Sequence, residues 1–96
     1  MGNLTIRQQQ SLAAELLKTT IDVVEKSSYV VENTKLLMVW VTESGTVPQQ
    51  NLRGGTRLIV DEKGEVLFCS STAISNDKMV EEFNNGRRTP LESFKN

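Results

Sequence analysis

The chain has no histidine and only one cysteine among its 96 residues. The absence of histidine excludes Ser-His-Asp and Cys-His nucleophile activation, imidazole acid–base chemistry near neutral pH and every histidine-containing zinc site. A lone cysteine, Cys69, excludes an intrachain disulfide. Cys69 ends the apolar run from Val66, which predicts a small buried residue and no thiolate nucleophile. We therefore expect no catalytic residues and no cofactor.

An excess of charge of either sign is also lacking. The chain has 11 basic and 12 acidic residues, and its two halves are alike in charge. Nucleic-acid binders usually carry a basic excess, and so do proteins that bind anionic lipid surfaces. Nucleic acid and membrane are therefore not expected partners. The chain also has no apolar segment typical of a signal peptide or a membrane span, and with its single cysteine this predicts a cytoplasmic protein.

The first expected element is one long amphipathic helix over residues 5–26. Thr5 and Gln8 match a capping box at its start. From Leu12 onward, the apolar residues fall within one half of the helical wheel. The first turns place Gln9 and Gln10 on that same face, so we expect this end to project past the core or to meet a partner.

The middle of the chain predicts strands. Residues 29–31 suit a short strand, and residues 35–42 form the strongest strand signal, apolar without alternation and therefore covered on both faces. Two further runs, residues 56–60 and 65–70, are joined by Asp61-Glu62-Lys63-Gly64. Asp at the first turn position and Gly at the fourth are typical of a type I hairpin turn with a left-handed glycine.

A second, shorter helix is expected from about Ser75 to Asn85, capped by Ser75 and ended by Gly86. The fold prediction is a single α+β domain over residues 1–86, with an irregular tail over residues 87–96. It combines the N-terminal helix, an antiparallel sheet of three or four strands with a β-hairpin, and the second short helix. We expect both helices to pack on the same side of the sheet, leaving the other side open.

The acidic residues around the hairpin turn, Asp61, Glu62 and Glu65, do not have the spacing of a calcium loop. We therefore expect no metal site.

The long segment 43–57 holds the most suggestive group of residues. Its two glycines, Gly54 and Gly55, allow backbone amides to approach an anion, and Arg53 and Arg57 are placed to clamp a phosphate or carboxylate. The segment leads into a strand, not into a helix N-terminus, and it lacks the Lys-Ser/Thr pair of a P-loop. The alternative interpretation is a connector with solvated arginines.

The leading functional hypothesis is a non-catalytic binding or regulatory module that self-associates as a homodimer. A small core favours this, and Gln9, Gln10 and Trp40 are the expected interface residues. One alternative is an enzyme or binder of small anionic ligands that uses Arg53 and Arg57. A further alternative, nucleic-acid binding, requires that the fold gather Arg53, Arg57, Arg87 and Arg88 on one surface.

The stretch from Arg57 to Ser70 resembles the strand–turn–strand of PAS-type sensor domains and the last hairpin of thioredoxin-like proteins. It covers fourteen residues, and the chain lacks the Cys-x-x-Cys pair of the thioredoxin family. The pattern is one that any hairpin with this turn shows, so we assign neither family.

Overall fold

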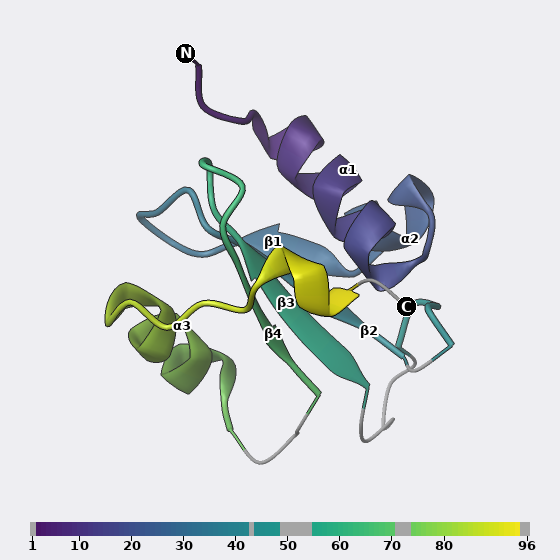
Figure 1. Ribbon diagram of the computed structural model, residues 1–96. Helices are drawn as coiled ribbons and strands as arrows, with labels where there is room; N and C mark the ends of the chain where they lie inside the picture. Colours follow the sequence, from purple (N-terminus) through teal and green to yellow (C-terminus); the bar gives the residue numbers. More distant parts are fainter. Residues whose placement is uncertain (1, 43, 49–54, 71–73, 95–96) are drawn as a thin grey trace.

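The computed structural model describes residues 2–42, 44–48, 55–70 and 74–94 of the chain. Its centre is a four-stranded antiparallel sheet in which each strand pairs with the next along the chain (Figure 1). The strands are β1 (Ser28–Val30), β2 (Leu37–Val41), β3 (Thr56–Val60) and β4 (Val66–Cys69). The helices are α1 (Ile6–Leu17), α2 (Ile21–Lys26), α3 (Asn76–Asn84) and the short 3₁₀ helix η1 (Leu91–Phe94). The α+β prediction is thereby confirmed.

The prediction of a single N-terminal helix is wrong, because the chain forms two helices there. Lys18 ends α1 in the left-handed conformation, with φ of 58°. The Thr20 side chain then accepts a hydrogen bond from the Val23 amide and caps α2. The threonine side chain competes for backbone hydrogen bonds and favours helix caps over helix interiors. Thr19-Thr20 therefore allows a new helix to begin, although the apolar periodicity continues without interruption.

The predicted signals at other element ends are confirmed. Thr5 and Gln8 form the capping box of α1, and Ser75 caps α3 by accepting from the Lys78 amide. In the hairpin, the Asp61 carboxylate accepts from the amides of Lys63 and Glu65, and Gly64 has φ of +84°. An aspartate at this position reproduces a backbone turn with its side chain, which explains the tight connection between β3 and β4.

The helices cover both faces of the sheet, which corrects the expectation that they share one side. In Figure 1, α1 and α2 lie on one side of the sheet and α3 lies on the other. Because side chains alternate along a strand, β2 sends Leu37, Val39 and Val41 toward α1 and α2, and Met38 toward α3. Burying apolar residues on both faces of β2 requires a cover on each, and the chain supplies both.

The tail after α3 returns to the sheet. The Thr89 amide donates to the Val66 carbonyl over 2.8 Å, and the Thr89 hydroxyl accepts from the Phe68 amide over 2.8 Å. Further on, the Phe94 ring meets Phe68 edge-to-face at 5.5 Å between centroids. Residues of the tail therefore fasten the outer edge of β4. Within the described ranges, no helix is long and apolar enough to cross a membrane.

Candidate binding groove

Part of the α3 face of the sheet is left uncovered. The buried residues of α3, Met79 and Phe83, pack with Met38, Ile59 and Leu67, and α3 contacts β3 and β4. Next to it on this face, Tyr29 of β1 is 50% exposed and Trp40 of β2 is 37% exposed. The two residues share the face because Tyr29 pairs with Met38, and Trp40 lies two residues beyond Met38 on the same strand.

A cavity of about 330 Å³ opens at this place, and we call it the aromatic groove. It brings together the end of α2, β1, β2, the segment after β2 and the first residue of α3. The residues that line it are Lys26, Ser27, Ser28, Tyr29, Met38, Trp40, Val47, Pro48 and Asn76. Its volume lies at the lower end of the range of about 300–1,000 Å³ for ligand pockets, which are lined mostly by apolar and aromatic side chains.

A chain of hydrogen bonds fixes one wall of the groove. The Arg57 guanidinium, on β3, donates to the Asn76 side-chain oxygen over 2.9 Å and also to the Ile74 carbonyl. The Asn76 amide nitrogen donates in turn to the Tyr29 hydroxyl over 3.1 Å. Arg57 is 9% exposed, so this network links β3, α3 and β1 from a buried guanidinium to the exposed Tyr29 hydroxyl. A wall held in this way is preorganised, which lowers the cost of ordering it when a ligand binds.

The position of Trp40 depends on Gly55 and Arg57. Trp40 pairs directly with Arg57 across β2 and β3. Gly55 precedes β3 with φ of +100°, and a Cβ built on it would come within 2.9 Å of the Trp40 indole nitrogen. Only a glycine fits this approach without a shift of its neighbours, so the residue before β3 sets the space that the indole occupies.

The polar character of the groove is limited. Among the lining residues that the structure describes, Lys26 is the single ionisable cation, and none carries a carboxylate. The hydroxyl of Ser28 is buried and has no hydrogen-bond partner within the described residues. The arrangement is suited to bind an apolar or aromatic group beside a negative charge, and its described lining residues include no nucleophile–base pair for covalent chemistry.

The predicted anion site is only partly within the described residues. Arg53 and Gly54 lie outside them, whereas Gly55 and Arg57 are described. Arg57 is buried and donates to oxygen atoms of the protein itself. Its position therefore indicates a structural role in holding α3 on the sheet, and anion binding by the four residues together stays a prediction.

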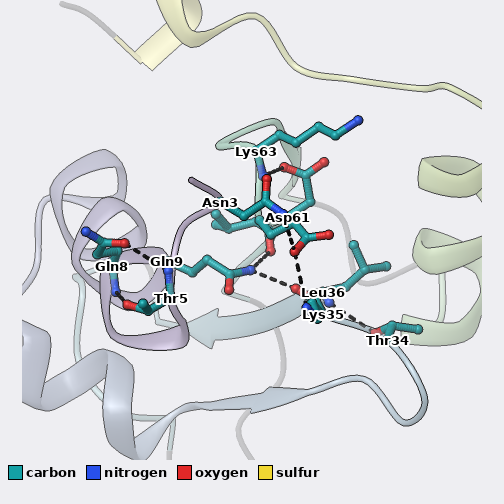
Figure 2. Close-up of polar contacts among 11 residues, drawn as sticks. Asn3, Thr5, Gln8, Gln9, Thr34, Lys35, Leu36, Asp61 and Lys63 are labelled. Atoms are coloured by element: carbon teal, nitrogen blue, oxygen red, sulfur yellow. Dashed lines mark hydrogen bonds and ion pairs between the residues drawn. The ribbon is translucent and has the colours of Figure 1, made fainter. Parts of the chain in front are cut away.

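Gln9 and Gln10 differ sharply in their environment. Gln9 is 1% exposed, and its amide nitrogen donates to the Lys35 carbonyl and the Val60 carbonyl over 2.8 Å each (Figure 2). Gln9 therefore belongs to the core of its own chain, whereas the sequence predicted it as an interface residue at the end of a projecting helix. It lies one turn before Ala13 on the buried face of α1, and it binds carbonyl oxygens where β2 begins and β3 ends. Gln10 is half-buried.

The remaining candidates of the sequence have structural partners. Arg88 pairs with Glu65 over 2.8 Å and stacks on the Phe83 ring, and Arg87 pairs with Glu82. Arg57 is buried on the sheet, so it does not share an exposed surface with them. Cys69 is half-buried beside the second core cluster, and no three His, Cys, Asp or Glu side chains of the described ranges form a group fit for a metal ion.

Sequence reasoning missed Tyr29 and Asn76 as members of a site. The sequence predicts Tyr29 in a short strand and Asn76 in the first turn of a helix, and both predictions are confirmed. No local pattern places the two near each other, because they are 47 positions apart in the chain. The sequence held one indication of the site, the residue type of Tyr29, because an aromatic ring with a hydroxyl in a short strand suits a half-exposed binding surface.

The chain was compared with known proteins in three ways. It matches no protein-family model, and neither the curated proteins nor the solved structures gave a significant match. The function must therefore be argued from the geometry of this chain.

Proposed function

We propose that this protein is a non-catalytic binding module that takes an apolar or aromatic side chain of a protein partner into the aromatic groove, and that it self-associates. The observation that carries the first part is the exposure of Tyr29 and Trp40 beside one cavity. Tryptophan and tyrosine are the residue types that most often dominate the binding energy of protein interfaces. A groove walled by both is a natural anchor pocket.

The charge of the lining residues defines the partner further. Lys26 lies at the groove, and the other lining residues in the described part of the chain include no carboxylate. An acidic residue next to the anchoring side chain is therefore favoured in the partner, since complementary charge supports both encounter and specificity. The partner that fits is a peptide segment in which a leucine-like or aromatic residue precedes Asp or Glu.

Trp40 allows a direct test, because it is the only tryptophan of the chain and lies in the groove itself. Its fluorescence is followed while N-acetyl-Leu-Glu-amide is added, with N-acetyl-Leu-Lys-amide as the matched control peptide. We expect a saturable change with the acidic peptide, with a dissociation constant of about 1–10 mM for so small a ligand. The basic peptide should bind at least about threefold more weakly.

Two variants locate the binding. Lys26→Gln should remove the preference for the acidic peptide, and Tyr29→Ala should weaken both peptides. Equal binding of the two peptides to the unmodified protein, or no saturable change in the emission of Trp40, would contradict the groove proposal.

Self-association has separate support. A chain of 96 residues has a small core, and additional burial through a partner copy is a common solution. Four of the large apolar side chains exposed in the described ranges, Ile6, Tyr29, Val30 and Trp40, come from α1, β1 and β2. Sedimentation velocity from about 1 to 100 µM, the range in which weak specific dimers assemble, tests this part. A monomer mass of 10.7 kDa throughout would contradict it.

A further inference from the structure

The two outer strands of the sheet differ in whether other parts of the chain bind their free edge. At β4, the tail closes the edge, because Thr89 binds both the Val66 carbonyl and the Phe68 amide. At β1, the other outer strand, no comparable bond is formed by the residues that the structure describes. An open strand edge presents a row of backbone donors and acceptors and is a template for pairing with another strand.

The hydrogen-bond ladder shows which groups of β1 are open. The Trp40 amide donates to the Ser27 carbonyl over 3.0 Å, and the Val31 amide donates to the Leu36 carbonyl over 2.9 Å. In an antiparallel ladder, hydrogen-bonded residues alternate along the strand. Ser27, Tyr29 and Val31 therefore direct their backbone groups toward β2. The N–H and C=O groups of Ser28 and Val30 point away from the sheet.

We propose that two copies of the chain pair antiparallel through β1, with Tyr29 on the two-fold axis, so that one continuous sheet crosses the dimer. Ser28 of each copy then faces Val30 of the other, and each of these pairs exchanges both of its backbone hydrogen bonds. This assignment rests on the self-association proposed above and adds the surface, the register and the symmetry. The pattern is self-complementary, as a two-fold interface requires.

The residues that flank β1 have complementary charges in this register. Lys26 precedes the strand and Glu32 follows it, and both are exposed. Antiparallel pairing about Tyr29 brings Lys26 of each copy close to Glu32 of the other, so that the dimer has two such charge pairs. A parallel arrangement would place like charges together, so the charge pattern favours the antiparallel pair.

The apolar residues that remain exposed near β1 are covered by the same pairing. Val30 is 41% exposed and lines a shallow cavity with Ile6, which is 38% exposed. On the opposite face, the Tyr29 rings of the two copies meet next to the axis, because residues outside the hydrogen-bonded pairs approach most closely. Each ring also lines its own aromatic groove, so the partner copy contributes to the wall of the site and the two grooves become neighbours on one face.

Charge reversal tests the register. Because β1 has only three residues, we expect weak association, with a dissociation constant of about 1–100 µM by sedimentation. Lys26→Glu alone and Glu32→Lys alone should each weaken it about tenfold, since each places like charges together at both ends. The double variant Lys26→Glu, Glu32→Lys should restore it to within about threefold of the unmodified chain, because unlike charges again meet. Failure of the double variant to recover overturns the register.

Cross-linking tests the position of the axis. Residues opposed outside the hydrogen-bonded pairs have Cα atoms about 4.5 Å apart, which is within the range that a disulfide spans. In a Cys69→Ser background, Tyr29→Cys should form a covalent dimer on oxidation. Leu91→Cys is the matched control, because Leu91 is equally exposed at 50% but lies in the tail, and it should stay monomeric.

The outcomes separate the two proposals. Dimers that respond neither to charge reversal nor to cross-linking at position 29 overturn the β1 pairing and leave self-association in place. A protein that shows no dimer at about 100 µM, a concentration at the upper end of the expected dissociation constants where dimers would already be well populated, overturns both. Because Lys26 and Tyr29 take part in both proposals, peptide binding is followed through Trp40 at about 1 µM protein, at the lower end of the expected dissociation constants, where the groove of the monomer is tested.

Discussion

The indole nitrogen of Trp40 lies against the backbone of Gly55, where a side chain would bring a β-carbon within 2.9 Å of it. The same β-carbon would stand 2.5 Å from the Val41 carbonyl oxygen. Gly55 thus combines a backbone conformation that other residues rarely adopt with a contact that they do not fit. The aromatic groove depends on this small residue as much as on its aromatic walls.

Gly55→Ala should therefore destabilise the protein more than an ordinary replacement of a left-handed glycine. We expect a loss of about 2–4 kcal/mol in the free energy of unfolding, measured by denaturant titration, together with a shift in the emission of Trp40. Gly86→Ala is the matched control, because Gly86 has φ of +99° and nothing within 4 Å of the added carbon. It should lose only about 1 kcal/mol. Equal losses would show that the contact with Trp40 has no energetic weight.

Replacing the glycine of the hairpin turn should also destabilise the protein, but by less. Gly64 has φ of +84°, and a Cβ there would meet only Leu4 and Leu12 at 3.7 and 3.9 Å, which is ordinary contact. Gly64→Ala should cost about 1 kcal/mol of unfolding free energy, because the strain of the left-handed conformation is the main change. A change indistinguishable from zero in denaturant titration would argue against this turn.

Gln9 and Gln10 allow a comparison of neighbours with different roles. Gln9→Ala removes one buried and one part-buried hydrogen bond and leaves the carbonyls of Lys35 and Val60 without their side-chain donor. We expect it to lower the free energy of unfolding by about 2–4 kcal/mol, since buried groups that lose a partner are costly. Gln10→Ala should change stability by less than about 0.5 kcal/mol. Similar losses in chemical denaturation would disagree with the burial of Gln9.

Thr89 is expected to protect the outer edge of β4. Thr89→Val keeps the amide that donates to Val66 but removes the hydroxyl that accepts from the Phe68 amide. The loss should be about 1 kcal/mol in stability, with faster hydrogen exchange at the Phe68 amide. Thr34→Val is a useful control, because the Thr34 hydroxyl also accepts from a backbone amide, that of Leu36, but in a different turn. Its replacement should leave exchange at Phe68 unchanged.

Local signals in the sequence predicted most of the secondary structure. The capping box at Thr5, the cap at Ser75 and the turn from Asp61 to Gly64 were all readable because each depends on residues a few positions apart. The apolar run around Val39 also predicted correctly that both faces of its strand are buried. What it did not contain was which helix covers which face.

The errors concern contacts between distant parts of the chain. Gln9 looked like a surface residue because glutamine usually is one, and its carbonyl partners are 26 and 51 positions away. The helix break at Lys18 is invisible to apolar periodicity, which continues through α2. The groove arises where the first residue of α3, Asn76, meets Tyr29 of β1, and no local residue pattern predicts this contact across 47 positions.

The order of the strands in the sheet is the same as their order in the chain. Each strand therefore pairs with a strand next to it in the sequence, and no strand pairing joins remote segments of the chain. Contacts between segments close in sequence cost little loop-closure entropy. Refolding from denaturant should therefore be fast for a sheet protein, on the order of milliseconds to tens of milliseconds, as for other small mixed domains. We expect the slower events to be those that join the two ends of the chain to this sheet, because the contacts of Gln9 with Val60 and of Thr89 with Val66 span longer stretches of sequence.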